Sequence, residues 1–216
     1  MDRIIDIVLP AIPQTLVMVI ASTIIALLIG IPLGIILTTT RPGGLTESTK
    51  LYSILDGIIN VLRSFPFVIL MIVVFPLSRL IVGKSYGTAA MIIPLSLSAA
   101  PFVARLMEGY FIQVDQGIIE AAKSMGSTKR EIIFKVLIPE AMPMVVTGIT
   151  MTIINVIGYS AMAGVMGGGG LGDVANRYGY QRNEPLILWS AVIVIIILVQ
   201  IVQLIGNKIA DKIDRR

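Results

Sequence analysis

Long runs without charged residues alternate with shorter charged stretches along the chain. A helix that crosses the hydrocarbon core of a membrane needs about 20 predominantly apolar residues. Five runs reach or approach that length, and the pattern predicts a membrane-spanning helix in each. The predicted spans are residues 15–37, 64–82, 85–104, 141–172 and 185–207. The pattern therefore predicts an all-α protein that crosses the membrane five times.

The second span is the least regular of the five. Its uncharged part, Ser64–Ser78, is too short to cross the membrane alone. It reaches Val82 only if the stem of Arg79 lies along apolar surface while the guanidinium reaches the headgroups. Proline and glycine also occur in or beside the spans, where they indicate either packing by small residues or hinges for gating. These residues are Pro32, Pro66, Pro76, Pro94, Pro101, Pro143, Gly30, Gly34, Gly148, Gly158 and Gly164.

Lysine and arginine set the orientation, because they concentrate in the cytoplasmic loops of membrane proteins. With the N-terminus outside, twelve of them lie on the inner side: Arg41, Lys50, Arg63, Arg105, Lys123, Lys129, Arg130, Lys135, Lys208, Lys212, Arg215 and Arg216. Five lie outside: Arg3, Arg79, Lys84, Arg177 and Arg182. We therefore expect an external N-terminus and a cytoplasmic C-terminus. The apolar stretch after Met1–Arg3 is too long for the core of a signal peptide, so we expect it to stay attached.

The composition agrees with a membrane protein and excludes several kinds of site. Hydrophobic residues make up 56% of the 216 residues and charged residues only 14%. Cysteine and histidine are both absent, which excludes disulfides, cysteine nucleophiles, zinc clusters and imidazole bases. The net charge of +4 is spread between apolar segments and forms no dense basic patch, so we expect no nucleic-acid partner.

One long stretch of mixed charge, residues 105–140, separates the third and fourth spans. Apolar residues near 118–125 and 132–136 predict two short helices, and Gly126 suits the left-handed position that ends the first. Thr128 and Glu131 have the spacing of a capping box that starts the second. Ala121 and Ala122 are small enough to let another surface approach, and Pro139 is expected to close the unit. By itself, such a helix–turn–helix is often only a connector.

The spacing within this loop resembles a known motif. Glu120-Ala121-Ala122, three further residues, Gly126 and then Val136-Leu137-Ile138-Pro139 resemble the EAA loop of ATP-binding-cassette importer permeases, whose usual ending is Ile-x-Leu-Pro. Two aliphatic residues differ from that ending and keep its size and polarity. Residues 60–67, 100–105, 158–164 and 167–172 look like the methionine-importer branch of this family. The resemblance covers nearly the whole chain.

The resemblance implies an architecture and a set of partners. The fold would be a type I importer-like bundle with a cytoplasmic EAA coupling loop, forming a single permease domain over residues 1–216. Two copies would pair in a bacterial inner membrane, each docking on one of two cytoplasmic ATPase subunits, while an external binding protein or lipoprotein delivers L- or D-methionine. ATP and Mg²⁺ would bind to the ATPase, so this chain would need no cofactor and would not itself be an enzyme. Closed two-fold pairing also suits five helices, which are few to enclose a path.

Two groups of residues are candidates for function. The resemblance assigns docking on the ATPase to the loop, and the segment from Gly117 to Ile132 is expected to transmit its motion. The docking residues would be Glu120, Ala121, Ala122, Lys123, Met125, Gly126, Ser127 and Thr128. The translocation path or gate is expected at Tyr159, Ser160 and Met162, because an unbranched thioether among small neighbours can close a narrow path and repack. A core role for Met162 is an equal alternative.

Other functions fit the sequence less well. Residues 78–85 end like a P-loop, but Ser78 replaces the first glycine and no strand precedes them. Gly167, Gly169 and Gly172 have a dinucleotide-binding spacing, yet they follow a membrane helix, so a flexible or tightly packed glycine turn is expected instead. The last three spans contain no charge, which disfavours coupling to an ion gradient. The open alternatives are a permease for another amino acid, an ATP-independent channel and a membrane-bound enzyme.

Overall fold

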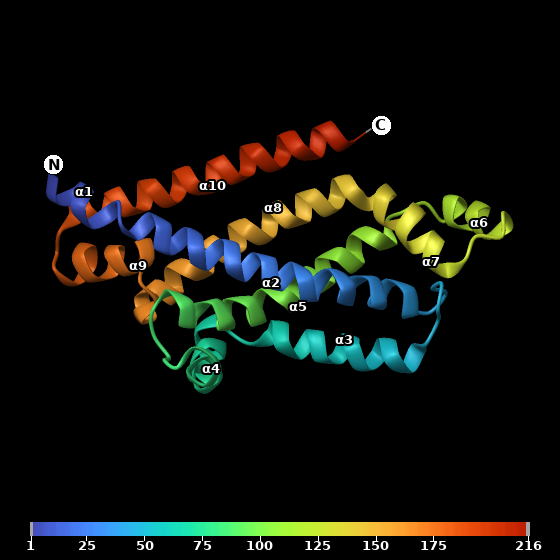
Figure 1. Ribbon diagram of the computed structural model, residues 1–216, viewed down its shortest axis with the longest axis horizontal. Helices are drawn as coiled ribbons and strands as arrows, with labels where there is room; N and C mark the ends of the chain where they lie inside the picture. Colours follow the sequence, from blue (N-terminus) through green and yellow to red (C-terminus); the bar gives the residue numbers. More distant parts are fainter. Residues whose placement is uncertain (1, 215–216) are drawn as a thin grey trace.

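The computed structural model describes residues 2–214, and the secondary structure of this part of the chain is helical throughout. Four long helices run along the long axis of the molecule (Figure 1). They are α2 (Ala11–Thr40), α5 (Thr88–Ile112), α8 (Ile138–Ala163) and α10 (Pro185–Ile213). Each is long and apolar enough to cross a membrane, which confirms four of the five predicted spans.

The remaining span is bent: one helix fills most of the predicted range 64–82, but the helix that precedes it was not predicted. The span consists of α3 (Thr49–Ser64) and α4 (Phe67–Val82), which meet at an angle of 106° and together satisfy the length of one crossing. The break falls at Phe65-Pro66, because proline lacks a backbone N–H and disfavours a helical residue before it. Phe65 accordingly has an extended backbone.

The ends of the straight spans also differ from the prediction. Helix α5 continues to Ile112 rather than ending near residue 104, which brings Arg105 and Glu108 into the helix. Helix α8 ends at Ala163 rather than at residue 172. The glycine-rich residues beyond it form the short segments η2 (Gly164–Gly168), α9 (Gly170–Val174) and η3 (Ala175–Gln181) at the end of the molecule that holds the N-terminal helix α1 (Asp2–Val8).

Small residues allow the central helices to pack closely. A Cβ on Gly30 would lie 2.5 Å from Cβ of Val103, and one on Gly34 would lie 2.6 Å from Cβ of Met107. This small-x-x-x-small spacing on α2 lets its backbone approach α5, as is usual between membrane helices. The prolines noted in or beside the predicted spans all lie within continuous helices, except Pro66. These features favour packing over hinges at every such proline except Pro66.

The main apolar core continues from the bundle into the segment at the opposite end of the molecule. That segment contains α6 (Gln116–Ser124), α7 (Lys129–Glu131) and η1 (Ile132–Leu137). Buried members of one cluster include Val103 and Phe111 of α5, Ile119 of α6, and Ile132 and Leu137 of η1. The segment is therefore packed against the bundle and does not hang from it as a free loop.

Candidate functional site

We call the segment from α6 to η1 (residues 116–137) the inner segment and the end that holds α1 the outer end, after the orientation that lysine and arginine predict. The first helix of the inner segment has a defined beginning and end. The Asp115 carboxylate accepts a hydrogen bond from the Gly117 backbone N–H at 2.7 Å and caps the start of α6. At the other end, the Ser127 N–H donates to the Ala122 carbonyl at 3.1 Å, and the Gly126 N–H donates to the Lys123 carbonyl at 2.9 Å. This pair of bonds is a Schellman motif. Gly126 has a φ of +80°, which confirms the predicted left-handed turn.

The second helix begins with the predicted capping box. The Glu131 N–H donates to the Thr128 hydroxyl at 3.3 Å, and the Thr128 N–H donates to the Glu131 carboxylate at 3.0 Å. Lys135 adds an ion pair to Glu131 at 3.0 Å. Hydrogen bonds from the Thr128 backbone, then from Lys135 and the Thr128 hydroxyl, lower the pKa of the Glu131 carboxyl from 4.5 to about 2. The cap is therefore fully ionised at neutral pH.

Pro139 does not close the segment, which corrects the expectation of a second short helix. The backbone stays helical from Lys129 through η1 and into α8, and Pro139 lies in the first turn of α8. Proline inside a helix lacks the N–H for the i−4 bond and crowds that carbonyl. The π-helical turn of η1 directly before Pro139 widens the backbone where this conflict arises. The second helix of the segment is thus a rigid extension of α8.

The two faces of the segment differ in their surroundings. Ile119 and Ala122 are buried against the core, so Ala122 supports the fold of the loop from inside. The other predicted docking residues are exposed or half-exposed: Glu120, Ala121, Lys123, Met125, Gly126, Ser127 and Thr128. Met125 is 79% exposed, and the nearby Phe134, which sequence reasoning missed, is 67% exposed. The outward face therefore combines apolar side chains with charge, as protein-binding surfaces do.

The glycine run at the outer end is tightly packed, which decides between the two predicted forms of that turn. Gly167, Gly169 and Gly170 all have a positive φ. The Gly170 N–H donates to the Gln14 side-chain oxygen at 2.7 Å, and the Leu171 N–H donates to the Thr15 hydroxyl at 2.9 Å. A Cβ on Gly172 would lie only 2.1 Å from the Ala161 carbonyl oxygen. The run folds back onto α2 and α8.

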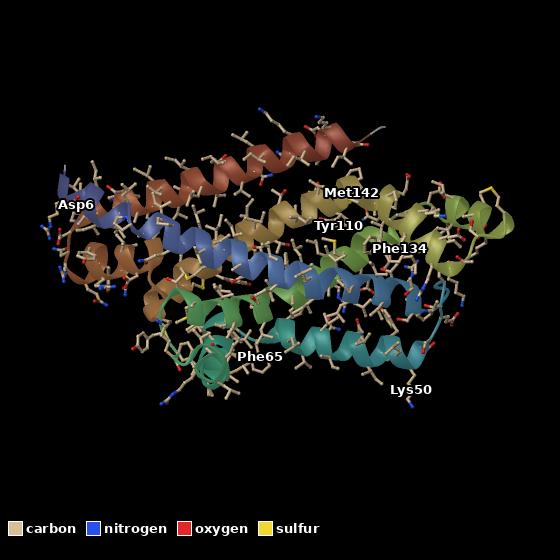
Figure 2. All side chains as sticks on the ribbon, in the orientation of Figure 1. Asp6, Lys50, Phe65, Tyr110, Phe134 and Met142 are labelled. Atoms are coloured by element: carbon tan, nitrogen blue, oxygen red, sulfur yellow. The ribbon has the colours of Figure 1, made fainter. Side chains whose placement is uncertain are left out.

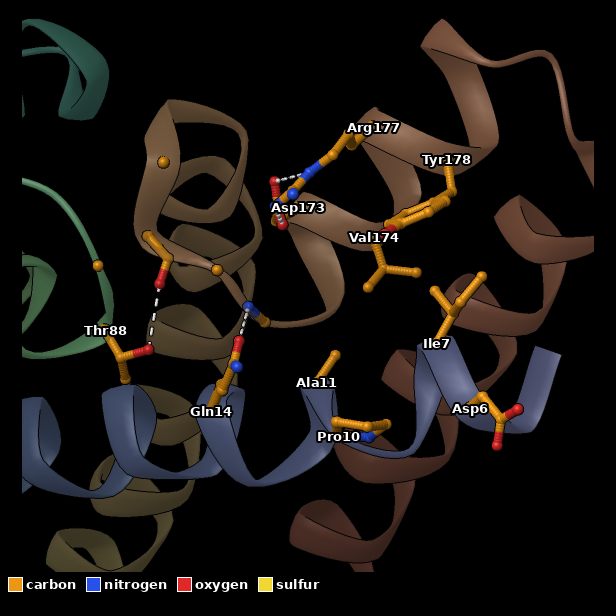
Figure 3. Close-up of a pocket in the computed structure, with 15 residues that line it drawn as sticks. Asp6, Ile7, Pro10, Ala11, Gln14, Thr88, Asp173, Val174, Arg177 and Tyr178 are labelled. Atoms are coloured by element: carbon orange, nitrogen blue, oxygen red, sulfur yellow. Dashed lines mark hydrogen bonds and ion pairs between the residues drawn. The ribbon is translucent and has the colours of Figure 1, made fainter. Parts of the chain in front are cut away.

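A cavity of about 400 Å³ lies beside the glycine run (Figure 3). Gln14 of α2 and Thr88 of α5 point toward the backbone of the run, and Thr88 donates to the Gly168 carbonyl at 3.2 Å. On the far side, Asp173 and Arg177 form an ion pair. Hydrogen bonding to Asp173 raises the pKa of the Arg177 guanidinium, which keeps that group charged. The outer mouth is thus polar and held by contacts from three helices.

The three predicted path residues lie on different faces of α8. Tyr159 stacks on Phe67 of α4, with ring centroids 4.7 Å apart. Ser160 is buried and donates to the Ile157 carbonyl at 2.7 Å, so its hydroxyl is occupied within its own helix. Met162 is 48% exposed. Of the three, only Met162 has an exposed side chain within the described chain, and its place in a path stays a prediction.

Comparison with known proteins gives a consistent result. The family described as "Binding-protein-dependent transport system inner membrane component" matches residues 30–216. The chain belongs to this family. The probable D-methionine transport system permease protein MetI of Vibrio cholerae is 47% identical over 98% of this chain and 94% of its own. The methionine import system permease protein MetP of Bacillus subtilis is 44% identical over 84% and 82% of the two chains. A solved inward-facing structure of the MetNI methionine ABC transporter has a TM-score of 0.97 at 38% identity, with complete coverage of both chains.

This inner membrane component also contains a partly buried charged cluster that sequence reasoning missed. Arg105 of α5 forms ion pairs with Asp56 of α3 and, at 2.6 Å, with Glu108, whose exposure is 2%. Asn60 accepts from Arg105 at 3.0 Å and donates to Asp56 at 3.0 Å. The cluster fastens the polar face of α3 to α5. It corrects the expectation that the third span carries no charge, since α5 extends past residue 104.

The P-loop-like string has an ordinary structural role in the permease family fold. Residues 78–82 form the last turns of α4, and Gly83 ends the helix with a φ of +81°. No strand precedes it, and residues 84–87 form a turn before α5. The glycines that mimic a dinucleotide motif likewise connect helices. Neither string has the strand–loop–helix geometry that holds phosphates.

Proposed function

We propose that this chain is the permease subunit of an ATP-driven methionine importer. It forms the translocation path, pairs with a second copy of itself and docks on two cytoplasmic ATPase subunits, and an external binding protein delivers the substrate. The names of the relatives, which include D-methionine transport permeases and a methionine import permease, support this substrate. The close similarity to the MetNI methionine ABC transporter supports both the ATP-binding-cassette class and a single permease domain.

The observation that carries the proposal is the continuity between the inner segment and the bundle. A lever must keep its shape while force is applied to its end. Here α6 is capped at both ends, the second helix runs straight into α8, and the same apolar cluster includes α5, α6 and η1. A push on the exposed Glu120–Thr128 face would therefore reach two spans directly. This arrangement suits docking on an ATPase, whereas a plain connector has no need of it.

The orientation and the division of labour follow from the same proposal. The inner segment lies in the cytoplasm, so the N-terminus is outside and the C-terminus is in the cytoplasm. ATP and Mg²⁺ bind to the ATPase, and this chain carries no catalytic residue or cofactor of its own. Met162, together with Tyr159 and Ser160, belongs to the outer gate. Membrane lipid surrounds the exposed apolar faces of the chain. Three exposed aromatic residues near the outer end anchor the chain at the membrane interface: Tyr86, Tyr180 and Trp189.

Reconstituted transport tests the proposal. The chain is purified with the ATPase and placed in vesicles with its binding protein, and uptake of labelled L- and D-methionine is measured with and without ATP. We expect ATP-dependent uptake of at least one isomer. Uptake of a different amino acid, without uptake of methionine, would show that the substrate is not methionine. Equal uptake with and without ATP would favour the alternative of a channel.

Charge reversal in the docking face tests the role of the loop. Glu120→Lys should leave insertion and pairing intact, because Glu120 is exposed and lies outside the bundle. It should lower uptake more than ATP hydrolysis, or release the ATPase. Asp211→Lys is a matched control, since Asp211 is exposed at the inner end of α10 and lies outside the docking face. Normal uptake by the Glu120 variant, with the ATPase bound, would reduce the loop to a connector.

A further inference from the structure

Arg63 lies within the membrane-spanning part of the chain, although its position in the sequence suggested an inner loop. Helix α3 begins at Thr49 on the inner side and runs beside α5 toward the outer end (Figure 1). At 1.5 Å per residue, Arg63 lies about 20 Å along this helix. Measured from an inner boundary at the start of α3, this is about two thirds of the way across a hydrocarbon core about 30 Å thick. Charged residues at such depth are rare and usually mark a pathway or a binding site.

The Arg63 side chain is exposed and unpaired. No hydrogen bond or ion pair holds it within residues 2–214. The two nearest carboxylates along α3 and α5, those of Asp56 and Glu108, are both already paired with Arg105. The positive charge of Arg63 is therefore not compensated by the chain itself. The nearer headgroups then lie about 10 Å away, beyond the reach of an arginine stem.

A cavity of about 290 Å³ lies beside Arg63, between α3 and α5. Arg105, Tyr110 and Gln113 supply its polar wall, while Phe102 and Leu106 supply apolar surface. Its size is at the lower end of the range of about 300–1,000 Å³ for small-ligand pockets. A cavity with a cationic corner and an apolar wall suits a small molecule that carries both an anionic group and an apolar side chain.

One residue of the cavity wall, Tyr110, contacts the helix that carries the predicted gate. The Tyr110 hydroxyl lies 3.9 Å from the Met151 sulfur, which joins the cavity wall on α5 to α8. Met151, Gly158 and Met162 are exposed and spaced by seven and four residues, so they form one stripe along α8. The stripe runs from the cavity to the outer end. Figure 2 places Tyr110 along the bundle and Phe65 at the bend between α3 and α4, two residues after Arg63 in the sequence.

We propose that Arg63 binds the carboxylate of the amino acid during its passage, with the apolar side chain against Phe102 and Leu106. Guanidinium–carboxylate pairing is charge-assisted and often bidentate, which makes it strong and directional. Arg105 is a positioning residue: it neutralises Asp56 and Glu108, so neither carboxylate repels the substrate. This inference rests on the proposed import function, because it takes methionine as the ligand.

Binding to the permease–ATPase complex without the binding protein isolates this site. Binding of labelled methionine and its displacement by methionine or methionine amide are measured for the parent complex and for Arg63→Gln. Charge-assisted bonds of this kind are typically equivalent to about a tenfold change or more in affinity. We expect amidation to weaken binding about tenfold in the parent and to matter little in Arg63→Gln, with Arg63→Lys in between. Because Arg63 is unpaired, Arg63→Gln should fold normally.

Arg79→Gln is the control, since Arg79 is an exposed arginine of the same bent span and lies outside the cavity. Equal discrimination between acid and amide in the parent and in Arg63→Gln would overturn the inference. So would a parent that shows no carboxylate-dependent binding up to the low-millimolar range. Loss of co-purifying anionic phospholipid in Arg63→Gln, with unchanged methionine binding, would identify a lipid site and also overturn it. If ATP-driven methionine uptake persists in the parent, these failures leave the proposed function standing.

Discussion

The two ends of the molecule each carry a turn between helices, and they are stabilised in different ways. At the inner end, the turn around Gly126 is held by bonds between residues at most five apart, together with the Thr128–Glu131 cap. At the outer end, the turn around Gly170 is held by Gln14 and Thr15, which are 156 residues away. The inner turn is therefore a self-contained unit, whereas the outer turn depends on the position of α2.

This difference suits the two ends to different tasks. A self-contained turn keeps its shape when a partner pushes on it, because its bonds do not cross between moving helices. An outer turn bonded to α2, α5 and α8 changes its contacts whenever those helices shift. The inner end can thus transmit motion and the outer end can respond to it. The partly buried cluster of Arg105, Asp56 and Glu108 keeps α3 attached to α5 between the two ends.

The largest effect is expected from Arg105→Met, which tests whether the inner half is held by charge. Removal of Arg105 leaves Glu108 buried and Asp56 partly buried without their partner. Removing one partner of a buried ion pair typically costs about 3–5 kcal/mol. We expect a large loss of thermal stability in detergent. The triple variant with Asp56→Asn and Glu108→Gln should recover much of it, and parent-like stability of the single variant would show that the cluster contributes little.

A methyl group at Gly172 tests whether the outer half is held by close backbone contact. The added Cβ in Gly172→Ala would lie 2.1 Å from the Ala161 carbonyl oxygen, so the backbone must move. Overpacking of this kind typically costs about 1–3 kcal/mol. Gly57→Ala is the matched control, because a Cβ there meets nothing within 4 Å inside α3. Thermal unfolding of both variants decides the point, and equal melting temperatures would contradict the tight packing.

The inner turn should respond to backbone strain and not to crowding. A Cβ on Gly126 meets nothing within 4 Å, but its φ of +80° is unfavourable for a β-branched residue. Gly126→Val should therefore cost about 1–3 kcal/mol locally and lower uptake more than ATP hydrolysis. Asparagine tolerates the left-handed region better, so Gly126→Asn should retain most coupling. Full coupling in the valine variant would show that the turn angle is unimportant.

Local signals in the sequence predicted the inner turn well. A capping box and a left-handed glycine are each read from a few neighbouring residues, and both predictions are confirmed. Contacts between distant residues were not predictable in this way. Gln14 sits in an apolar run with no local partner, and Asp56 and Arg105 are 49 residues apart.

The errors at α3 and α5 share one cause, whereas the end of α8 was placed too late because the uncharged run continues through the glycines. Helix α3 was missed because its polar residues, including Asp56 and Asn60, interrupt the apolar pattern, although they are paired in the folded chain. Helix α5 was ended too early for the same reason, at Arg105. Among the candidate site residues, the exposure of the loop residues could be predicted from helical spacing. The burial of Ser160 could not, because it depends on how α8 packs against its neighbours.

The smallest effect concerns the pH dependence of the inner cap, and it would sharpen the claim that this end is held locally. The pKa of Glu131 is lowered to about 2, first by the Thr128 backbone N–H and then by Lys135. A lowered pKa means that the carboxylate stabilises the folded loop fully above pH 4.5 and loses this contribution as the pH falls toward 2. Ionisation of Glu131 should therefore leave coupling constant between about pH 5 and 8. Titration of the ¹³C-labelled Glu131 carboxyl by NMR measures the midpoint directly. Lys135→Gln should raise it only part of the way, since the backbone bond remains, and a parent midpoint near 4.5 would show that the cap is open in solution.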